Sequence, residues 1–309
     1  MKSSPPDRIG IDLGGTKIEA VRLSPTGEIR YRHRCATPHG DYDRIIDVLT
    51  EVVEMAQLSF PDLEPATVGI GAPGARSHKT GMIKNSNTTV INGKNLPEDL
   101  EQACGYPIRI ANDADCFTLS EAIDGAGAGQ AVVFGVILGT GVGGGICIDQ
   151  KLTPGVNSIA GEWGHNPMPL DRLNSAITLP LTRGRDCYCG QRDCIETWLS
   201  GPGVAASYAE MTGKSLTAKQ IFDPVGPKAT TQMVFDIYCE LAALALSTVI
   251  NVIDPACIVL GGGVSNTDHL ASAIQKRLLH YVFSDQVDTQ VMAAHHGDAS
   301  GVRGAAWLW

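Results

Sequence analysis

The sequence lacks a cluster of basic residues. Its 309 residues include 24 Lys and Arg against 33 Asp and Glu, which gives a formal net charge of -9 at pH 7. A protein that binds nucleic acid neutralises backbone phosphates with lysine and arginine and gathers these residues on one face. We therefore expect no nucleic acid partner and expect small molecules as partners.

Long apolar runs are also scarce. The first seven residues, Met-Lys-Ser-Ser-Pro-Pro-Asp, contain none, so we expect no ordinary secretory signal. The most apolar segment, Leu241 to Ile253, is too short to span a bilayer and predicts a buried helix. These absences favour a cytoplasmic protein without a membrane partner. The length suits one large or two moderate domains.

The sequence gives no sign of an oxidising compartment despite its nine cysteines. Cys187, Cys189 and Cys194 lie within eight residues, and His165 precedes them. Three thiolates and one imidazole are the ligands of a closed tetrahedral zinc site. A structural zinc, which supplies about 10 to 16 kcal/mol of folding free energy in small peptides, would hold the long loop between them. Ordinary buried cysteines and a disulfide are the alternatives.

Two carboxylates accompany the predicted metal ligands. Glu162 lies three positions before His165, and Glu196 lies two positions after Cys194. The loop that carries the ligands would hold both carboxylates beside the metal. Carboxylates fixed near one another in a pocket suit the hydroxyl groups of a polyol, whereas a solvated surface position is the alternative.

A pair of glycines separates two predicted strands, Arg8 to Asp12 and Ile18 to Leu23. Glycine lets backbone N–H groups approach an anion because it has no Cβ atom. The hairpin adds a hydroxyl and a cation, and the carboxylate at the strand end would hold Mg²⁺ through water. A plain hairpin turn is the alternative. The residues predicted to bind nucleotide phosphate or Mg²⁺ here are Asp12, Gly14, Gly15, Thr16 and Lys17.

Residues 130–145 repeat this design. A predicted strand, Ala131 to Leu138, leads into a glycine-rich turn over 139–145 and a return strand, Ile146 to Asp149. A third glycine turn follows the predicted strand Ile258 to Leu260 and would pass close to adenine or ribose. Two phosphate hairpins suggest two similar lobes that clasp one nucleotide; a flexible linker is the alternative for the second. The nucleotide-binding residues predicted in these turns are Gly139, Thr140, Gly141, Gly143, Gly261, Gly262 and Gly263.

Asn112 and Asp113 lie where a predicted strand, Ile108 to Ala111, meets a predicted helix, Ala114 to Ile123. Aspartate at a helix N-terminus is a good cap, and the helix dipole favours its charged form. The functional interpretation of Asp113 is a general base. Asn87 belongs to a polar stretch that either contacts a sugar or forms a surface loop, and the residues leave both open.

Apolar periodicity predicts a helix over 43–58. Ile45, Leu49, Val52 and Ala56 recur at intervals of three and four and form one stripe against a sheet. Similar patterns predict strands over 28–33 and 68–71 and helices over 233–253, 270–282 and 301–309.

In this order the motifs resemble the ROK family of bacterial sugar kinases and repressors, and the resemblance covers nearly the whole chain. The motifs are Asp12-Leu-Gly-Gly-Thr-Lys17, Asn112-Asp113, Leu138-Gly-Thr-Gly-Val-Gly-Gly144, Gly161-Glu-Trp-Gly-His165, the Cys-x-Cys-Gly-x-x-x-Cys-x-Glu run and Gly261-Gly-Gly263. The resemblance implies ATP, Mg²⁺, a structural zinc and a homodimer.

The fold that the resemblance implies is α/β. It is a two-lobed actin-like and hexokinase-like (ribonuclease H-like) ATPase fold with a zinc-stapled loop. Residues 1–112 and about 298–309 would form a small N-terminal lobe, to which the C-terminal helix returns. Residues 113–297 would form a large C-terminal lobe that carries the zinc loop.

The resemblance also implies roles for single residues. Asp113 corresponds to the catalytic base of the family. His165 would be both a zinc ligand and a sugar contact, because a metal-bound imidazole keeps one nitrogen free. Asp193 stands where many relatives have a glycine, and the gap from His165 to Cys187 is longer than in most. The implied sugar contacts are Asn112, Asp113, Glu162, His165 and Glu196, with Asn87 as an addition.

The segments Gly-Glu-Trp-Gly-His-Asn-Pro-Met-Pro and Cys-Tyr-Cys-Gly most resemble those of the bacterial fructokinase (manno-fructokinase) branch. We therefore predict transfer of the γ-phosphoryl group of ATP to the 6-hydroxyl of fructose, with N-acetylglucosamine kinase and glucokinase as alternatives. A sugar-responsive repressor is disfavoured, because only seven residues precede the first predicted strand. The presence of Asp113 disfavours a catalytically silent sugar-binding module.

Overall fold

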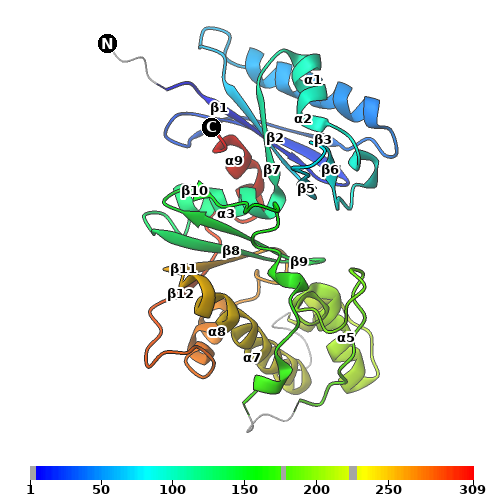
Figure 1. Ribbon diagram of the computed structural model, residues 1–309, viewed down its shortest axis with the longest axis vertical. Helices are drawn as coiled ribbons and strands as arrows, with labels where there is room; N and C mark the ends of the chain where they lie inside the picture. The colour runs from blue at the N-terminus through cyan, green and yellow to red at the C-terminus, as the bar shows by residue number, and fades with distance from the viewer. Residues whose placement is uncertain (1–4, 175–178, 223–227) are drawn as a thin grey trace. The chain divides into compact units, whose positions relative to one another are not determined.

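The computed structural model describes residues 5–174, 179–222 and 228–309, and the chain forms two compact units. The first unit contains the chain up to residue 128 together with 150–160 and 298–309, and the second contains 129–149 and 161–297. In Figure 1 the red C-terminal helix lies among the blue N-terminal strands of the first unit.

The boundary between the units differs from the division drawn on the sequence. Residues 113–128 and 150–160 belong to the first unit, whereas the sequence analysis placed them in the C-terminal lobe. The physical reason for the first difference is that helix α3 (Asp113–Ile123) packs against helix α9 (Ser300–Ala306) and strand β4 (Thr67–Ala72).

The first unit is built on a five-stranded sheet with the order β3-β2-β1-β4-β7. Its other strands are β1 (Arg8–Leu13), β2 (Lys17–Leu23), β3 (Ile29–Ala36) and β7 (Ile108–Asn112). The first three strands form an antiparallel meander, and β4 and β7 run parallel to β1. The remaining elements of this unit are α1 (Tyr42–Leu58), β5 (Ala75–Arg76), β6 (Ile83–Lys84), η1 (Thr89–Ile91), α2 (Leu96–Cys104) and β10 (Lys151–Leu152).

Helix α1 has the apolar stripe that its sequence predicts. The side chain of Asp41 caps the helix by accepting a hydrogen bond from the N–H of Arg44. The stripe is buried in the first core against the sheet, and its predicted members Ile45, Leu49, Val52 and Ala56 are all confirmed as buried.

Three glycines let helix α9 lie directly against its neighbours. A Cβ atom on Gly10 of β1 would lie 2.1 Å from a carbonyl oxygen of α9, and a Cβ atom on Gly69 of β4 would lie 2.0 Å from another. A Cβ atom on Gly304 of α9 would lie 1.6 Å from the carbonyl oxygen of Cys116 in α3. No side chain fits at these distances, so the backbones themselves are in contact. The C-terminal helix is therefore an integral part of the first unit, where Val302 and Ala306 form a small apolar cluster with Val21 and Leu23 of β2.

Buried polar contacts add to this attachment. Ser300 Oγ donates to the carboxylate of Glu121 at 2.7 Å. The Arg303 guanidinium donates to the carbonyl oxygen of Gly27 at 2.9 Å and pairs with Asp124. Each buried charge has an opposite charge or a hydrogen bond, which offsets the cost of its desolvation.

The sheet of the second unit contains four strands in the order β9-β8-β11-β12. Strands β8 (Val132–Leu138) and β9 (Val142–Ile148) are antiparallel, and β11 (Cys257–Gly261) and β12 (Gln290–Ala293) run parallel to β8. The remaining elements of the second unit are η2 (Trp163–His165), η3 (Leu170–Arg172), α4 (Glu196–Leu199), α5 (Gly201–Thr212), α6 (Ala218–Ile221), α7 (Lys228–Ile253) and α8 (Leu270–Leu278). The short helix η4 (Gly297–Ala299) begins at the last residue of the second unit, and its other two residues belong to the first unit.

The second glycine turn is shorter than predicted. Strand β9 begins at Val142, so the turn comprises residues 139–141, and Gly143 lies within the strand. The carbonyl oxygen of Gly143 accepts a hydrogen bond from Trp163 Nε1 at 2.9 Å. A Cβ atom on Gly144 would lie 2.9 Å from the Trp163 ring. The glycines of β9 therefore make room for η2, and Gly143 is corrected from a turn residue to a strand residue.

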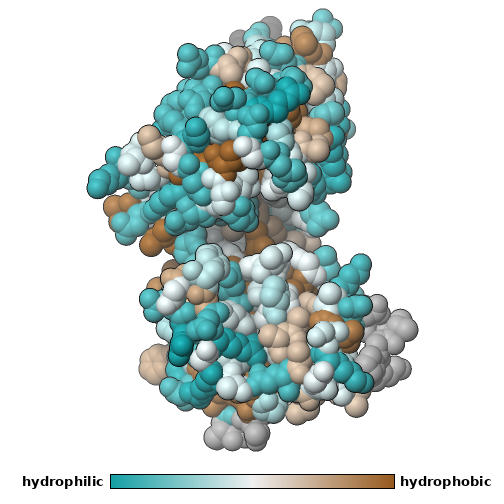
Figure 2. All heavy atoms as spheres, turned by 90° about the vertical axis from the view of Figure 1, so that its right-hand side faces the viewer, coloured by the Kyte–Doolittle hydropathy of each residue, from teal (hydrophilic) through white to brown (hydrophobic). Residues whose placement is uncertain are grey.

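Helix α7 corrects the expectation about bilayer length. Its span Ala229–Ile253 is long and apolar enough to cross a membrane by length and composition, because the helix extends well before Leu241. Of its most apolar window, 67% is buried inside the protein. Leu244 and Leu246 lie in the second core, as in a core helix. The molecular face in Figure 2 is mostly hydrophilic, with hydrophobic atoms in small separate groups.

Replacing Gly304 with alanine tests the contact of α9 with α3. The methyl group would lie 1.6 Å from a backbone oxygen, so we expect the free energy of unfolding to fall by about 1 to 3 kcal/mol. Gly301→Ala on the same helix is the matched control, because its methyl group would have its nearest contact at an ordinary 3.7 Å. Urea unfolding measures both, and equal stability of Gly304→Ala and wild type would contradict this packing.

Candidate functional site

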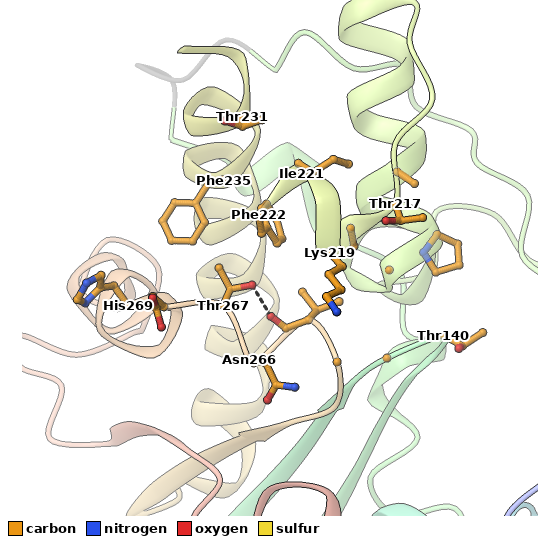
Figure 3. Close-up of a pocket in the computed structure, with 18 of the residues that line it drawn as sticks. Thr140, Thr217, Lys219, Ile221, Phe222, Thr231, Phe235, Asn266, Thr267 and His269 are labelled. Carbon is orange, nitrogen blue, oxygen red and sulfur yellow. Dashed lines mark hydrogen bonds between the residues drawn. The ribbon is translucent and has the colours of Figure 1, made fainter. Parts of the chain in front are cut away.

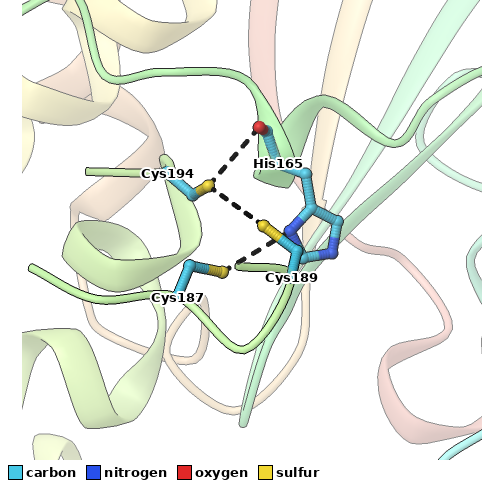
Figure 4. A group of neighbouring side chains, drawn as sticks. All are labelled: His165, Cys187, Cys189 and Cys194. Carbon is cyan, nitrogen blue, oxygen red and sulfur yellow. Dashed lines mark hydrogen bonds between the residues drawn. The ribbon is translucent and has the colours of Figure 1, made fainter. Parts of the chain in front are cut away.

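Four potential metal-ligating side chains converge in the second unit (Figure 4). One ring nitrogen of His165 and the Sγ atoms of Cys187, Cys189 and Cys194 lie within 4.8 Å of one another. His165 Nδ1 lies 3.7 Å from Cys187 Sγ, and Cys189 Sγ lies 3.5 Å from Cys194 Sγ. Thiolates around one tetrahedral zinc lie about 3.8 Å apart, so the donor set fits this ion. All nine cysteines of the chain are free thiols.

Backbone hydrogen bonds bring the two ligand-bearing segments together. The N–H of Met168 donates to the carbonyl oxygen of Asp193 at 2.8 Å, and the N–H of Ile195 donates to that of Asn166 at 2.9 Å. The segment that follows His165 therefore runs beside the segment that contains the last cysteine. This pairing places the ligands of the two segments around one centre.

Asp193 adopts a backbone conformation that glycine adopts more readily than other residues. Its φ is +54°, in the left-handed region that glycine adopts without strain. The carboxylate accepts hydrogen bonds from the N–H groups of Gly184 at 2.7 Å and Arg185 at 3.0 Å. These two bonds offset the conformational cost. The turn before Cys194 is retained, and the four ligands stay together.

The two predicted carboxylates lie beside this cluster. Glu196 Oε2 accepts a hydrogen bond from the N–H of Val142 at 2.9 Å, which fixes it against the β8–β9 turn. A Cβ atom on Gly141 would lie 2.6 Å from the same oxygen, so glycine is needed there. Glu162 is exposed at the start of η2. The structure thus gathers Glu162, His165 and Glu196 in one region of the second unit.

Tyr188 lies against His165, although it is not among the site residues that the sequence predicts. Its Oη atom lies 3.0 Å from His165 Nε2, and the two rings meet edge to face at 5.1 Å. Partial desolvation of the hydroxyl, together with the negative charges of Glu196 and Glu162, raises the pKa of Tyr188 to about 12. Tyr188 is therefore a neutral phenol at physiological pH. The sequence feature that could have identified Tyr188 is the position of an aromatic residue between two predicted metal ligands, Cys187 and Cys189.

The β1–β2 hairpin of the first unit has an exposed tip formed by Gly15, Thr16 and Lys17. The N–H of Gly14 donates to the carbonyl oxygen of Lys17 at 3.0 Å, and Thr37 Oγ1 donates to that of Gly14 at 2.7 Å. These bonds hold the turn in shape. A turn of this kind with a neighbouring ammonium group suits an anion.

Asp12 and Asp113 lie at the carboxyl edge of the first sheet. Asp12 is close to the end of β1, and Asp113 begins α3 directly after β7, which runs parallel to β1. Burial and the charge of Asp113 raise the pKa of Asp12 to about 6, while Lys17 acts in the opposite direction. Two interacting carboxylates at the ligand-binding edge of an α/β sheet suit a water-bound Mg²⁺ and a base.

Asn112 resolves which residue caps α3. Its Oδ1 accepts from the N–H of Ala114 at 2.8 Å and its Nδ2 donates to the carbonyl oxygen of Gly74 at 2.9 Å. The cap is therefore Asn112, and Asp113 is the first helical residue. Gly74 lies against Ser86, since a Cβ atom there would lie 2.9 Å from the N of Ser86. Asn87, exposed next to Ser86, thus lies in the loop beside this turn.

A cavity of about 1370 Å³ opens in the second unit (Figure 3). Of the predicted nucleotide-binding residues, Gly139, Thr140 and Gly263 line it. Gly262 instead has φ +86° and allows close approach to the backbone of β8. The other lining residues are Gly201, Pro202, Ala205, Thr217, Ala218, Lys219, Ile221, Phe222, Thr231, Gln232, Phe235, Val264, Asn266, Thr267, Asp268 and His269.

Much of the wall of this cavity was not predicted. Phe222 and Phe235 meet edge to face at 5.8 Å and give it an apolar side. Figure 3 shows Lys219 extending toward the loop that carries Asn266 and Thr267. Helices α5 to α7 bring these residues to the glycine turns, and no local motif marks them. The cavity has the mixture of apolar walls and a few polar groups that is typical of a small-molecule site.

Comparison with known proteins gives a consistent result. The sequence matches a model of the ROK family over residues 8–309. It is 37% identical over 301 residues to the N-acetyl-D-glucosamine kinase of Mannheimia succiniciproducens, and the matched region covers 97% of this chain and 98% of that protein.

Solved structures show the same fold. The ROK hexokinase from Thermus thermophilus superposes with a TM-score of 0.82 at 24% identity and covers 97% of each chain. A ROK family glucokinase from Streptomyces griseus, solved with glucose and AMPPNP, has a TM-score of 0.74 at 27% identity and covers 98% of each chain. The predicted two-lobed, hexokinase-like α/β fold class is confirmed.

The metal cluster, by which we mean the four side chains of His165, Cys187, Cys189 and Cys194, leads to a prediction about zinc. We expect the purified protein to contain about one zinc per chain, and we expect Cys187→Ser to lose it and to melt at a lower temperature. Cys35→Ser in the first unit is the control and should keep the metal. Metal analysis and thermal unfolding measure both. Less than about half a zinc per chain, with no loss of stability on chelation, would refute a zinc site.

The raised pKa of Asp12 leads to a prediction about pH. The folded protein holds the proton of the Asp12 carboxyl more tightly than the unfolded chain, whose aspartate titrates near pH 4. The free energy of unfolding therefore falls as the pH rises from about 4 to about 6. Asp12→Asn removes this decrease, and we expect the variant to be more stable than wild type at pH 8 by roughly 1 to 3 kcal/mol. The exposed Asp47→Asn is the control. Urea midpoints at pH 4, 6 and 8 test this, and parallel pH profiles of Asp12→Asn and wild type would contradict it.

Proposed function

Because this chain belongs to the ROK family, we propose that it is an ATP-dependent sugar kinase whose substrate is N-acetyl-D-glucosamine. The observation that carries the proposal is the 37% identity over 97% of the chain to a relative that bears this name. The glucokinase relative solved with glucose and AMPPNP supports a sugar and an ATP analogue as the kinds of ligand.

This proposed substrate differs from fructose, the first choice of the sequence-based prediction. The relatives favour its alternative, N-acetylglucosamine kinase, over fructokinase. The identity to the N-acetyl-D-glucosamine kinase relative extends over 97% of the chain, whereas the choice of fructokinase rested on short segments such as Gly-Glu-Trp-Gly-His. They indicate the chemistry of the site more strongly than the identity of the sugar, which depends on a few hydroxyl or N-acetyl contacts.

In this proposal the carboxylates beside the metal cluster bind the sugar. Glu162 and Glu196 accept hydrogen bonds from sugar hydroxyls, and the bond from Val142 to Glu196 keeps that side chain in place. His165, Cys187, Cys189 and Cys194 would hold a structural zinc. The bound ion would stabilise the loop and would take no part in the reaction.

Asp113 is assigned as the general base. A carboxylate at the start of α3 takes the proton of the attacking sugar hydroxyl, while Asn112 keeps the β7–α3 junction in place through its bonds to Ala114 and Gly74. Asp12 would hold Mg²⁺ through water, and the bound ion would neutralise negative charge on the phosphates. Phosphoryl transfer depends mainly on such positioning and charge stabilisation.

The cavity of the second unit is assigned to the nucleotide. The backbone of two turns lines this cavity: the β8–β9 turn with Gly139 and Thr140, and the turn after β11 with Gly263. The phenyl rings of Phe222 and Phe235 offer an apolar surface to a purine base. Lys17 and the exposed tip of the β1–β2 hairpin are assigned to the phosphates.

A coupled assay of ADP release tests the substrate. With Mg-ATP we expect N-acetylglucosamine to exceed fructose, mannose, glucose and N-acetylmannosamine in kcat/KM by about tenfold or more. Fructose as the best substrate would overturn the sugar assignment and restore the fructokinase prediction. No turnover of any of the five sugars would contradict the kinase.

Asp113→Asn tests the base. We expect kcat to fall by about a hundred- to ten-thousandfold, because the amide cannot accept the proton, while the KM for sugar changes little. Asp43→Asn, an exposed acid in the first turn of α1, is the matched control and should retain full activity. If Asp113→Asn keeps more than about a tenth of the wild-type rate, Asp113 is not the base.

A further inference from the structure

We propose that Tyr188 is a sugar-positioning residue that accepts a hydrogen bond from His165 and donates its own hydroxyl proton to an oxygen atom of the bound sugar. The inference rests on the proposed sugar kinase function and adds a residue to that site. No motif of the sequence assigned a role to Tyr188.

The orientation of the His165 ring fixes the direction of the hydrogen bond. Nδ1 lies 3.7 Å from Cys187 Sγ and so faces the metal cluster, whereas Nε2 lies 3.0 Å from Tyr188 Oη. A neutral imidazole that binds a metal through Nδ1 carries its proton on Nε2. His165 therefore donates and Tyr188 accepts. A phenol oxygen that accepts a hydrogen bond keeps its own proton for a second partner.

The exposure of Tyr188 leaves room for that partner. The residue is 83% exposed, although its ring meets the His165 ring edge to face with an interplanar angle of 85°. A tyrosine with so much exposed surface gains little from the hydrophobic effect at this position. Its placement is explained better by the hydroxyl, which is held at a defined point beside the metal cluster.

The chemistry of Tyr188 complements that of its neighbours. Glu196 and Glu162 lie close enough for their charges to act on the phenol, and ionised carboxylates only accept hydrogen bonds. These carboxylates can accept hydrogen bonds from the O–H groups of a sugar, but they have no proton to donate to a sugar oxygen that acts as an acceptor. Tyr188 supplies a donor to the same site. The ligand class is a sugar with an acceptor oxygen, either a hydroxyl oxygen or an amide carbonyl.

Tyr188→Phe tests the inference, because it removes only the hydroxyl. We expect the KM for the best sugar to rise by about three- to tenfold, the loss of one hydrogen bond, with kcat and the KM for ATP unchanged. Zinc content and melting temperature should equal those of wild type. Tyr31→Phe, a half-buried tyrosine on β3 of the first unit, is the matched control and should behave as wild type.

Calorimetric titration with N-acetylglucosamine and with fructose, without ATP, separates this inference from the proposed function. An unchanged dissociation constant and an unchanged KM in Tyr188→Phe would overturn the role of Tyr188 even if the wild type is a sugar kinase. Loss of zinc together with a lower melting temperature would also overturn it, because Tyr188 would then be a structural support. If the wild type binds sugar but does not phosphorylate it, the kinase proposal fails, and weaker binding by Tyr188→Phe still supports the inference.

Discussion

The convergence of three thiols and one imidazole within 4.8 Å is the contact on which the candidate site of the second unit depends. It joins the segment around His165 to the segment 187–196, which follows a long loop. Zinc binding can supply more free energy than such a loop gains by burying its own side chains. Glu162, Tyr188 and Glu196 lie on the same two segments. Their positions are therefore set by the geometry of the ligands and by the paired backbone between them.

The first unit depends on a different constraint, the direct contact of backbones. Gly304 brings α9 against α3, and the start of α3 carries Asp113. Gly301 at the start of the same helix lies close to Asp12, with its Cβ position 3.7 Å from the carboxylate. The packing of one short C-terminal helix thus positions the elements that hold both carboxylates. Burial, together with the interaction of these carboxylates, raises the pKa of Asp12.

Strong local patterns were sufficient to predict much of the fold. The stripe of Ile45 and Leu49 predicts α1, and the apolar strands on each side of the glycine pairs predict both hairpins. Glycine runs are ambiguous, because the same residue permits a turn and a close contact within a strand. For this reason the start of β9 was misplaced and Gly143 was assigned to a turn. The packing of α3 on α9, which places 113–128 in the first unit, has no local signal.

The candidate site shows the same contrast. The spacing of the cysteines predicts the metal ligands, and the structure brings these ligands together with His165. Phe222 and Phe235 could not be found from sequence, because tertiary packing brings their helices to the glycine turns. The preferred sugar depends on a few contacts whose geometry a motif does not encode, so the relatives, and not the motifs, favour N-acetylglucosamine.

If the metal ligands hold the sugar-binding carboxylates in place, sugar binding depends on the metal, and calorimetry on metal-loaded and chelated protein measures this dependence. Circular dichroism would first establish that the chelated protein retains its secondary structure. We expect chelation to abolish sugar binding or to weaken it by about tenfold or more, while binding of an ATP analogue to the cavity lined by Gly139 and Gly263 persists. Unchanged sugar affinity after complete removal of the metal would contradict this dependence.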